Sequence, residues 1–198
     1  MKKGIALFDF DGTITIKDST QSFYCYLYKS KFLYFLCHYV FCLWDFLLYQ
    51  MNFTSYIQLK AKRLHIHTSK FTESEFLNLT EEYYIKHFIS LLNTKAIDRI
   101  NWHKNQGHDV WVISASYDFL LNKWAFENSI NLITNKTAVE HSKRRMLGKD
   151  VNYYAKVEYL MTEVDLNHYK DIYAYGDSEG DSAMLSIANY KYFKSFRN

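Results

Sequence analysis

Residues 5–13 read Ile-Ala-Leu-Phe-Asp-Phe-Asp-Gly-Thr, and this stretch decides the fold of the chain. Residues 5–8 form a short apolar run, which is typical of a strand buried on both faces of a parallel sheet. Asp9 ends the run, Asp11 follows, and Gly12 provides a turn. Two carboxylates at the end of a buried strand repel each other unless a cation lies between them, so the stretch indicates a Mg²⁺ site. A strand end followed by a solvated acidic turn is the alternative interpretation.

Two later apolar runs also end in polar residues. Residues 110–113 are followed by Ser114, and residues 172–175 are followed by the acidic turn 176–181. Ligands bind outside the carboxyl ends of the strands in an open parallel sheet, so we expect these strand ends to converge on one site. Lys156, in a segment with helical spacing, adds a positive charge to that site.

Four ordered motifs of the sequence resemble those of the haloacid dehalogenase superfamily. They are Asp9-Phe10-Asp11-Gly12-Thr13, Ser114, Lys156 and Gly176-Asp177-Ser178-Glu179-Gly180-Asp181. The helical pattern between the first two motifs is similar to subfamily IB, the phosphoserine-phosphatase-like branch. Its apolar character resembles, more narrowly, the bacterial phosphatidylglycerophosphate phosphatases. The resemblance implies an α/β fold with a three-layer, Rossmann-like parallel sheet core over residues 1–17 and 93–198, and an inserted all-helical cap over residues 18–92.

The resemblance also implies a chemistry, that of a Mg²⁺-dependent phosphomonoester hydrolase with an aspartyl-phosphate intermediate. Asp9 would be the nucleophile, and Asp11 the general acid and base. Ser114 and Lys156 would bind the phosphoryl group and neutralise its charge. The metal would be held by Asp9, the backbone carbonyl of Asp11, and Asp177.

Supporting roles fall to residues near these motifs. Asp181 is expected to hold Lys156 or metal-bound water in place, with Ser178 beside it. The candidate substrate contacts are Thr13, Asp18 and Arg63. For Asp18 we prefer a role as the cap of a helix that follows it, to about residue 28.

The motif lysine has two candidates. The branch usually places this lysine a few residues after a glycine such as Gly148, and Lys149 follows Gly148 directly. Lys156 comes later but begins the expected amphipathic helix over 153–164. We therefore predict Lys156, with Lys149 as the alternative.

Residues 32–49 are apolar almost all round a helix, apart from His38 and Asp45. Such a helix is ~27 Å long, close to the hydrocarbon thickness of a bilayer. A single crossing there would separate Asp9 from Lys156, so it is incompatible with the predicted site. A buried cap helix, an interfacial helix and a re-entrant hairpin remain open. We interpret His38 and Asp45 as the wetter stripe of the helix.

Two further groups are expected on the surface. His65 and His67 lack the spacing of a metal site, and the basic run 143–145 is interpreted as solvated. We predict that residues 109–113 form a strand that ends before Ser114. A helix over 117–128 should then place its amino end beside that serine.

Composition limits the partners and the compartment. The formal charge is +3 and is not gathered into one field, which argues against a nucleic-acid partner. The three cysteines have neither zinc spacing nor an even count, so we expect reduced thiols. Asp9 and Asp11 interrupt the first apolar region too early for a secretory signal. We expect a cytoplasmic protein. A further expectation is that the cap attaches it peripherally to the inner face of the membrane.

The sequence does not decide which class of phosphate ester is the substrate. The apolar, aromatic insertion favours a lipid or another hydrophobic phosphomonoester. The alternatives are a small soluble metabolite such as phosphoserine, and phosphoryl transfer to an alcohol. A non-catalytic membrane-docking module is a further alternative, but every position that the chemistry needs is filled.

Overall fold

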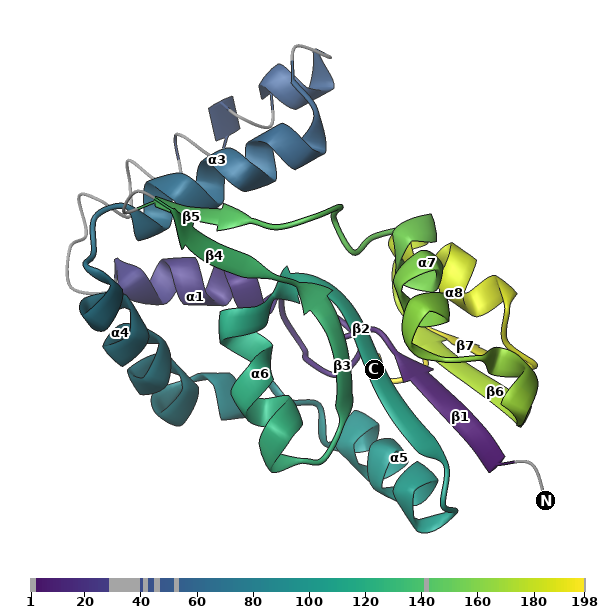
Figure 1. Cartoon of the computed structure of the whole chain (residues 1–198). Coiled ribbons are helices and arrows are strands. Elements are labelled where there is room, and N and C mark those ends of the chain that lie inside the picture. The colour runs from purple at the N-terminus through teal and green to yellow at the C-terminus, as the bar shows by residue number, and fades with distance from the viewer. Residues whose placement is uncertain are drawn as a thin grey trace.

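The computed structural model describes residues 3–28, 40, 43–44, 47–51, 54–140 and 143–197. Its centre is a five-stranded sheet in the order β3-β2-β1-β6-β7, in which every neighbouring pair is parallel. Helices cover both faces of this sheet (Figure 1). The predicted three-layer α/β fold is therefore confirmed.

The strands of this sheet are β1 (Lys3–Phe8), β2 (Asp109–Tyr117), β3 (Asn131–Asn135), β6 (Tyr169–Gly176) and β7 (Tyr190–Phe193). A separate antiparallel hairpin consists of β4 (Thr137–Glu140) and β5 (Lys143–Met146). The α-helices are α1 (Ser19–Leu27), α3 (Tyr56–Thr68), α4 (Glu73–Lys86), α5 (Thr94–Asn105), α6 (Asp118–Glu127), α7 (Tyr154–Glu163) and α8 (Ser182–Ser186). Short 3₁₀ turns are η1 (Phe88–Leu91), η2 (Leu166–His168) and η3 (Glu179–Asp181).

Strand β1 lies in the middle of the sheet and is buried on both faces. Because successive side chains of a strand point to opposite faces, Ile5 and Leu7 pack toward α7 and α8, while Ala6 and Phe8 pack toward α5 and α6. The amide of Asp9 donates to the carbonyl of Tyr175 at 2.9 Å, which extends the ladder by one residue. The nucleophile candidate is thus fixed by the central strand.

Local signals in the sequence set the ends of several helices. Asp18 caps α1 by accepting the amide of Gln21 at 2.6 Å, as predicted. Thr72 and Glu75 form a capping box at the start of α4. Helix α5 is followed by Gly107, whose φ of 72° is readily adopted by glycine.

The cap leaves and rejoins the core through two adjacent segments. Thr15 pairs with Leu92 in an isolated bridge, and the amide of Asn93 donates to the carbonyl of Ile14 at 2.8 Å. This arrangement is compatible with the predicted domain boundaries, which stay a prediction. Most of the predicted apolar helix over 32–49, including His38 and Asp45, lies outside the described residues. Among the helices that are described, none combines the length and the apolar character needed to span a membrane.

Three sequence predictions need correction, the first of them the end of β2. The strand does not stop before Ser114 but continues to Tyr117, with a shift of register between these two residues. Ser114 pairs with Thr134 and Tyr117 pairs with Asn135, so the backbone of β3 extends the ladder past the apolar run. Helix α6 consequently begins after Tyr117, further from Ser114 than we expected.

His67 is also buried rather than exposed. Its Nδ1 lies 2.8 Å from the hydroxyl of Tyr28, and its ring lies 4.1 Å from that of Tyr24. Two tyrosines of α1 and its cap thus provide the polar and aromatic partners that a buried imidazole needs.

Arg144, in the basic run, is buried as well. It lies on the β4–β5 hairpin, which the sequence analysis did not predict, and β5 packs against α3. Its guanidinium makes two bonds to Glu73 of α4, at 2.7 and 2.8 Å, and lies over the ring of Phe76 at 4.4 Å. The hairpin therefore attaches the cap to the core.

Candidate active site

A cavity of about 490 Å³ lies at the carboxyl end of β1, between the core and the cap. The core side contributes the motif residues of three strand ends together with α7. Of the predicted site residues, the cavity is lined by Asp9, Asp11, Asp18, Arg63, Ser114, Lys156, Asp177 and Ser178. The four motifs therefore meet around one space, as the sequence analysis expected.

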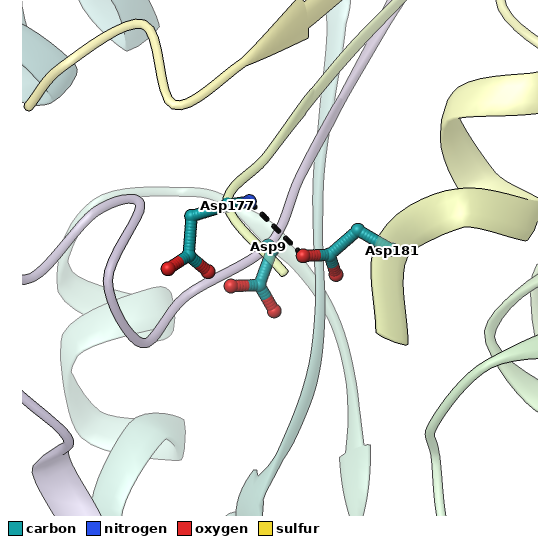
Figure 2. Close-up of side chains that lie close together, drawn as sticks. All are labelled: Asp9, Asp177 and Asp181. Atoms are coloured by element: carbon teal, nitrogen blue, oxygen red, sulfur yellow. Dashed lines mark hydrogen bonds between the residues drawn. The ribbon is translucent and has the colours of Figure 1, made fainter. Parts of the chain in front are cut away.

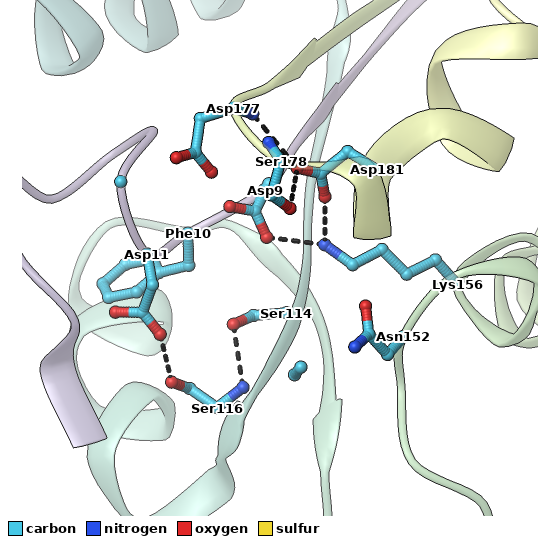
Figure 3. Close-up of polar contacts among 12 residues, drawn as sticks. Asp9, Phe10, Asp11, Ser114, Ser116, Asn152, Lys156, Asp177, Ser178 and Asp181 are labelled. Atoms are coloured by element: carbon cyan, nitrogen blue, oxygen red, sulfur yellow. Dashed lines mark hydrogen bonds and ion pairs between the residues drawn. The ribbon is translucent and has the colours of Figure 1, made fainter. Parts of the chain in front are cut away.

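Lys156 joins two of the buried carboxylates (Figure 3). Its Nζ lies 2.5 Å from Asp9 and 2.6 Å from Asp181, and all three side chains are almost fully buried. Burial raises the pKa of Asp9 to about 6, although the charge of Lys156 opposes this. Burial also acts against the charged form of Lys156, but the two carboxylates outweigh it and raise the lysine pKa. Lys149, the alternative motif lysine, is exposed and pairs with Glu158.

The acidic turn after β6 is held by its own last residue. Asp181 accepts the amides of Asp177 and Ser178 at 3.0 Å each and the hydroxyl of Ser178 at 2.9 Å. Burial alone would raise the pKa of Asp181, but Lys156 and the Ser178 bonds outweigh it and lower that pKa. Asp181 therefore stays ionised and fixes the turn that carries Asp177.

Asp177 lies close against the first motif. A Cβ on Gly12 would come within 2.4 Å of Asp177 Oδ2, and Gly12 has a φ of 80°, so only glycine fits this turn. The same carboxylate also accepts a bond from the guanidinium of Arg197. Burial raises the pKa of Asp177, and the charge of Arg197 opposes that rise.

The Asp11 carboxylate faces Ser116 and not Lys156 (Figure 3). Its carboxylate accepts the amide of Ser19 at 2.6 Å and the hydroxyl of Ser116. Burial, reinforced by the nearby charge of Asp18, raises the pKa of Asp11 to about 7. Asp11 is thus oriented separately from the Asp9–Lys156 pair, and its carboxylate stands apart from the acidic cluster described next.

Three carboxylates lie close enough to share a cation. Ligand oxygens of Asp9, Asp177 and Asp181 lie within 4.8 Å of one another, and all three residues are buried (Figure 2). Clustered carboxylate oxygens beside a cavity are the ligand type that Mg²⁺ prefers, with water or phosphate completing the shell. The donor set fits a divalent cation. The carboxylate of Asp11 is not part of this cluster over the described residues, and its backbone carbonyl stays a predicted ligand.

Ser114 is placed to donate a hydrogen bond. Its Oγ accepts the backbone amide of Ser116 at 3.0 Å. A hydroxyl that already accepts one bond still has its hydrogen to give. Because Ser114 lines the cavity, that hydrogen can be directed at an anionic ligand.

The cap contributes charges of both signs to the opposite wall of the cavity. Asp18 at the start of α1 and Arg63 on α3 line the cavity, together with Tyr24 and Tyr56. Thr13 is buried and is not part of the cavity lining over the described residues, so its contact with the substrate stays a prediction.

The sequence analysis did not place Ser116, Lys60 or Asn152 in the site, yet all three line the cavity. Lys60 on α3 donates to Asp150 at 2.5 Å and to the carbonyl of Ala115 at 2.7 Å, and thereby connects the cap to the core. Ser116 follows a motif serine by two residues, which was the one signal in the sequence that could have identified it.

The sequence matches the model of the haloacid dehalogenase-like hydrolase family over residues 6–186. The chain belongs to this family. The match includes all four motifs and the insertion between the first two. No curated protein matches the sequence.

Several solved structures have the same fold as this chain, although their sequence identity to it is low. A protein of unknown function from Bordetella pertussis Tohama I has a TM-score of 0.78 and 18% identity, over 95% of this chain and 88% of that chain. A phosphoserine phosphohydrolase-like protein from Francisella tularensis subsp. tularensis SCHU S4 has a TM-score of 0.67 and 18% identity, over 98% and 86%. A phospho-aspartyl intermediate analogue of phosphoserine phosphatase has a TM-score of 0.53 and 20% identity, over 96% and 86%.

Proposed function

We propose that this hydrolase is a Mg²⁺-dependent phosphomonoester phosphatase that acts through an aspartyl-phosphate on Asp9. The observation that carries the proposal is the arrangement around one cavity of Asp9, paired with Lys156, and of Asp11, held separately by Ser19 and Ser116. A nucleophile and a proton donor that are positioned independently are what ester cleavage with an oxygen leaving group requires.

The first half of the reaction forms the covalent intermediate. The Asp9 carboxylate attacks phosphorus, the bond from phosphorus to the leaving oxygen breaks, and protonated Asp11 gives its proton to that oxygen. Lys156 and the hydroxyl of Ser114 stabilise the charge on the phosphoryl oxygens. Ser116 and the amide of Ser19 hold the Asp11 carboxyl toward the leaving group.

The second half releases phosphate. The oxygen of a water molecule attacks phosphorus while the Asp11 carboxylate takes a proton from that water. The bond between phosphorus and the Asp9 oxygen breaks. Inorganic phosphate leaves, Asp9 is regenerated and Asp11 is protonated again. The two halves therefore use Asp11 in opposite proton states, and Asp9 first as the nucleophile and then as the leaving group.

Mg²⁺ would be held by Asp9, Asp177 and the backbone carbonyl of Asp11, with Asp181 beside them. When bound, it would offset the repulsion between the carboxylates and the phosphate dianion. The acidic cluster and its closeness to the cavity support this assignment.

The test of the activity is Asp9→Asn. The variant keeps the shape of the side chain but loses its charge and nucleophilicity, so we expect turnover of p-nitrophenyl phosphate with Mg²⁺ to fall by at least ~10³-fold. Asp171→Asn, outside the cavity, is the control and should retain activity. Equal turnover of the Asp9 variant and the wild type would refute the proposal, as would an inactive wild type with Mg²⁺.

For the substrate we favour a hydrophobic phosphomonoester such as a phospholipid precursor, because tyrosines 24, 49, 56 and 117 and Leu59 line the cavity. Asp18 and Arg63 on the cap wall support the alternative, a small soluble ester that carries both charges. An assay with Mg²⁺ distinguishes the two substrate classes by comparing turnover of phosphatidylglycerophosphate in detergent with turnover of phosphoserine. A preference for phosphoserine or sugar phosphates would refute the lipid substrate, and phosphorylated alcohols formed in the presence of acceptor alcohols would identify a phosphotransferase.

A lipid substrate would place the cap at the inner face of the membrane. Trp44, Leu47, Met51 and Ile57 are each more than half exposed, which supports peripheral contact. We expect cosedimentation with anionic vesicles that is weakened by Trp44→Glu with Ile57→Glu. Phe126→Glu, at a still more exposed ring on α6, is the control and should change nothing. Failure of the wild type to bind vesicles would refute membrane contact but leave the phosphatase proposal intact.

A further inference from the structure

The loop before α7 brings an amide side chain into the cavity. Asn152 lines the cavity together with Lys156 and Ser114, and Figure 3 shows its side chain reaching into the space beside Lys156. None of the family motifs in the sequence includes this position. Its chemistry differs from that of its neighbours, because a primary amide presents two N–H donors without a charge.

The loop that carries Asn152 is tightly held. The amide of Asn152 donates to the carbonyl of Asp150 at 2.8 Å, and the amide of Tyr153 donates to the carbonyl of Gly180 at 3.1 Å. Tyr153 adopts a φ of 49°, which is unfavourable for a bulky residue and persists only where surrounding contacts impose it. The position of Asn152 is therefore imposed by the fold.

One hydrogen bond sets the orientation of the amide. The backbone amide of Tyr153 donates to Asn152 Oδ1 at 3.0 Å, so the oxygen is turned toward the loop. The Nδ2 group then points away from the loop. Over the described residues, no protein group accepts a bond from Nδ2, and a ligand in the cavity can do so.

Gly180 makes room for this side chain. A Cβ at position 180 would lie 2.3 Å from Asn152 Oδ1, which is closer than any real contact. The φ of Gly180 is outside the left-handed region, so the backbone there does not require glycine. Glycine is needed at position 180 because any side chain there would clash with Asn152 Oδ1.

The motif residues Lys156 and Ser114 have few hydrogens left to donate to a phosphoryl group, and Asn152 lies beside them. Lys156 gives two of its three N–H bonds to Asp9 and Asp181, so one remains, and Ser114 offers one hydroxyl hydrogen. Resting on the phosphatase function proposed above, we infer that Asn152 Nδ2 binds a non-bridging oxygen of the transferring phosphoryl group. It thus acts as a catalytic residue that the motif pattern does not contain.

The test measures binding of inorganic phosphate by calorimetry in the presence of Mg²⁺. Asn152→Asp keeps the oxygen that accepts from Tyr153 but replaces the donor by a negative charge. We expect phosphate affinity to fall by at least ~10-fold, and the KM for p-nitrophenyl phosphate to rise in parallel, which corresponds to about 1.4 kcal/mol. Asn152→Ala should lose ~5-fold, within the range of one neutral hydrogen bond. Asn101→Asp, an exposed change of equal charge on α5, should bind phosphate as the wild type does.

Gly180→Ala separates a contact with phosphate from a merely structural role. The new methyl group should displace Asn152 and weaken phosphate binding in the wild-type background, yet add little in the Asn152→Ala background. Unchanged phosphate affinity in both Asn152 variants would overturn the inference, as would independent, additive effects in this cycle. Because the wild type must first be active and lose activity in Asp9→Asn, failure of the phosphatase proposal is recognised separately.

Discussion

The two faces of the central sheet are packed with different kinds of side chain. On the face of Ile5 and Leu7, the buried partners from α7 and α8 are mainly aliphatic, among them Leu160 and Met184. On the face of Phe8, about half of the buried residues are aromatic, whereas the described buried residues of the other face include no ring. Phe8 stacks on Tyr175 at 4.3 Å between centroids.

Because of this difference, the charged residues of the candidate site lie on one face of the sheet and the cap packs on the other. Asp9 follows Leu7 on the aliphatic side, where Lys156 and Asp181 arrive from α7 and η3. The ring face continues into the cap, because Phe10 stacks with Phe88 at 5.8 Å. The aliphatic face therefore positions the charged network of Asp9, Lys156 and Asp181 among apolar side chains. The face of Phe8 provides an aromatic surface on which the cap packs.

The largest expected effect tests the charged network on the aliphatic side. Lys156→Met leaves two buried carboxylates without their cation, so we expect a loss of about 3–5 kcal/mol in the free energy of unfolding without added metal. Turnover should fall by at least ~10²-fold. Urea unfolding and phosphatase assays measure the two effects. Lys149→Met is the matched control, and its exposed pair with Glu158 should contribute less than about 0.5 kcal/mol. The reverse ranking would assign the motif to Lys149.

A smaller effect tests how the ring face holds the cap. Arg144→Met removes two bonds to half-exposed Glu73 and a charge over Phe76, which should cost about 1–2 kcal/mol in urea unfolding. Its neighbour Arg145 is exposed, and Arg145→Met should cost less than about 0.5 kcal/mol. Equal stabilities of the two variants would show that the hairpin does not attach the cap.

The smallest effect is a pH dependence that belongs to the ring face. Burial, with the charges of His108 and Arg99, lowers the pKa of His103 to about 3. Below the ordinary histidine pKa of about 6.5, the unfolded chain binds a proton that the folded protein excludes, so this group lowers stability as the pH falls from there toward about 3.

We expect His103→Gln to unfold with a shallower acid dependence than the wild type, by about 1 kcal/mol per pH unit between pH 6.5 and 5.5. Urea unfolding at a series of pH values measures the slope. His168→Gln, at an exposed histidine, should keep the wild-type slope. Identical slopes in all three proteins would contradict the burial of a neutral His103.

The sequence was sufficient for the parts of the site that depend on strand ends. An apolar run that stops at Asp9 must leave its carboxylate at the edge of a parallel sheet, and the same reasoning places Asp177. Ser114 was also expected in the site, although β2 continues past it to Tyr117. Lys156 could be chosen over Lys149 from helical spacing alone. These predictions depend only on neighbours along the chain.

Contacts between distant segments could not be predicted in this way. Arg144 is polar in every local measure, and its burial depends on Glu73 and Phe76, which reach it only through the packing of α4 on the hairpin. Asn152 is a similar case, because its place depends on the missing side chain of Gly180. A single sequence gives no sign of such pairs.

The position of β1 in the sheet has a consequence for biosynthesis. Ile5 pairs with Asp109 on one side and with Ile172 on the other, so the strand waits for about 100 residues of further translation before its first partner exists. Closing loops of that length delays folding, and an apolar strand without partners is prone to aggregate. The nascent chain should therefore depend on chaperones at the ribosome until β2 and β6 have emerged to enclose the strand that ends in the nucleophile.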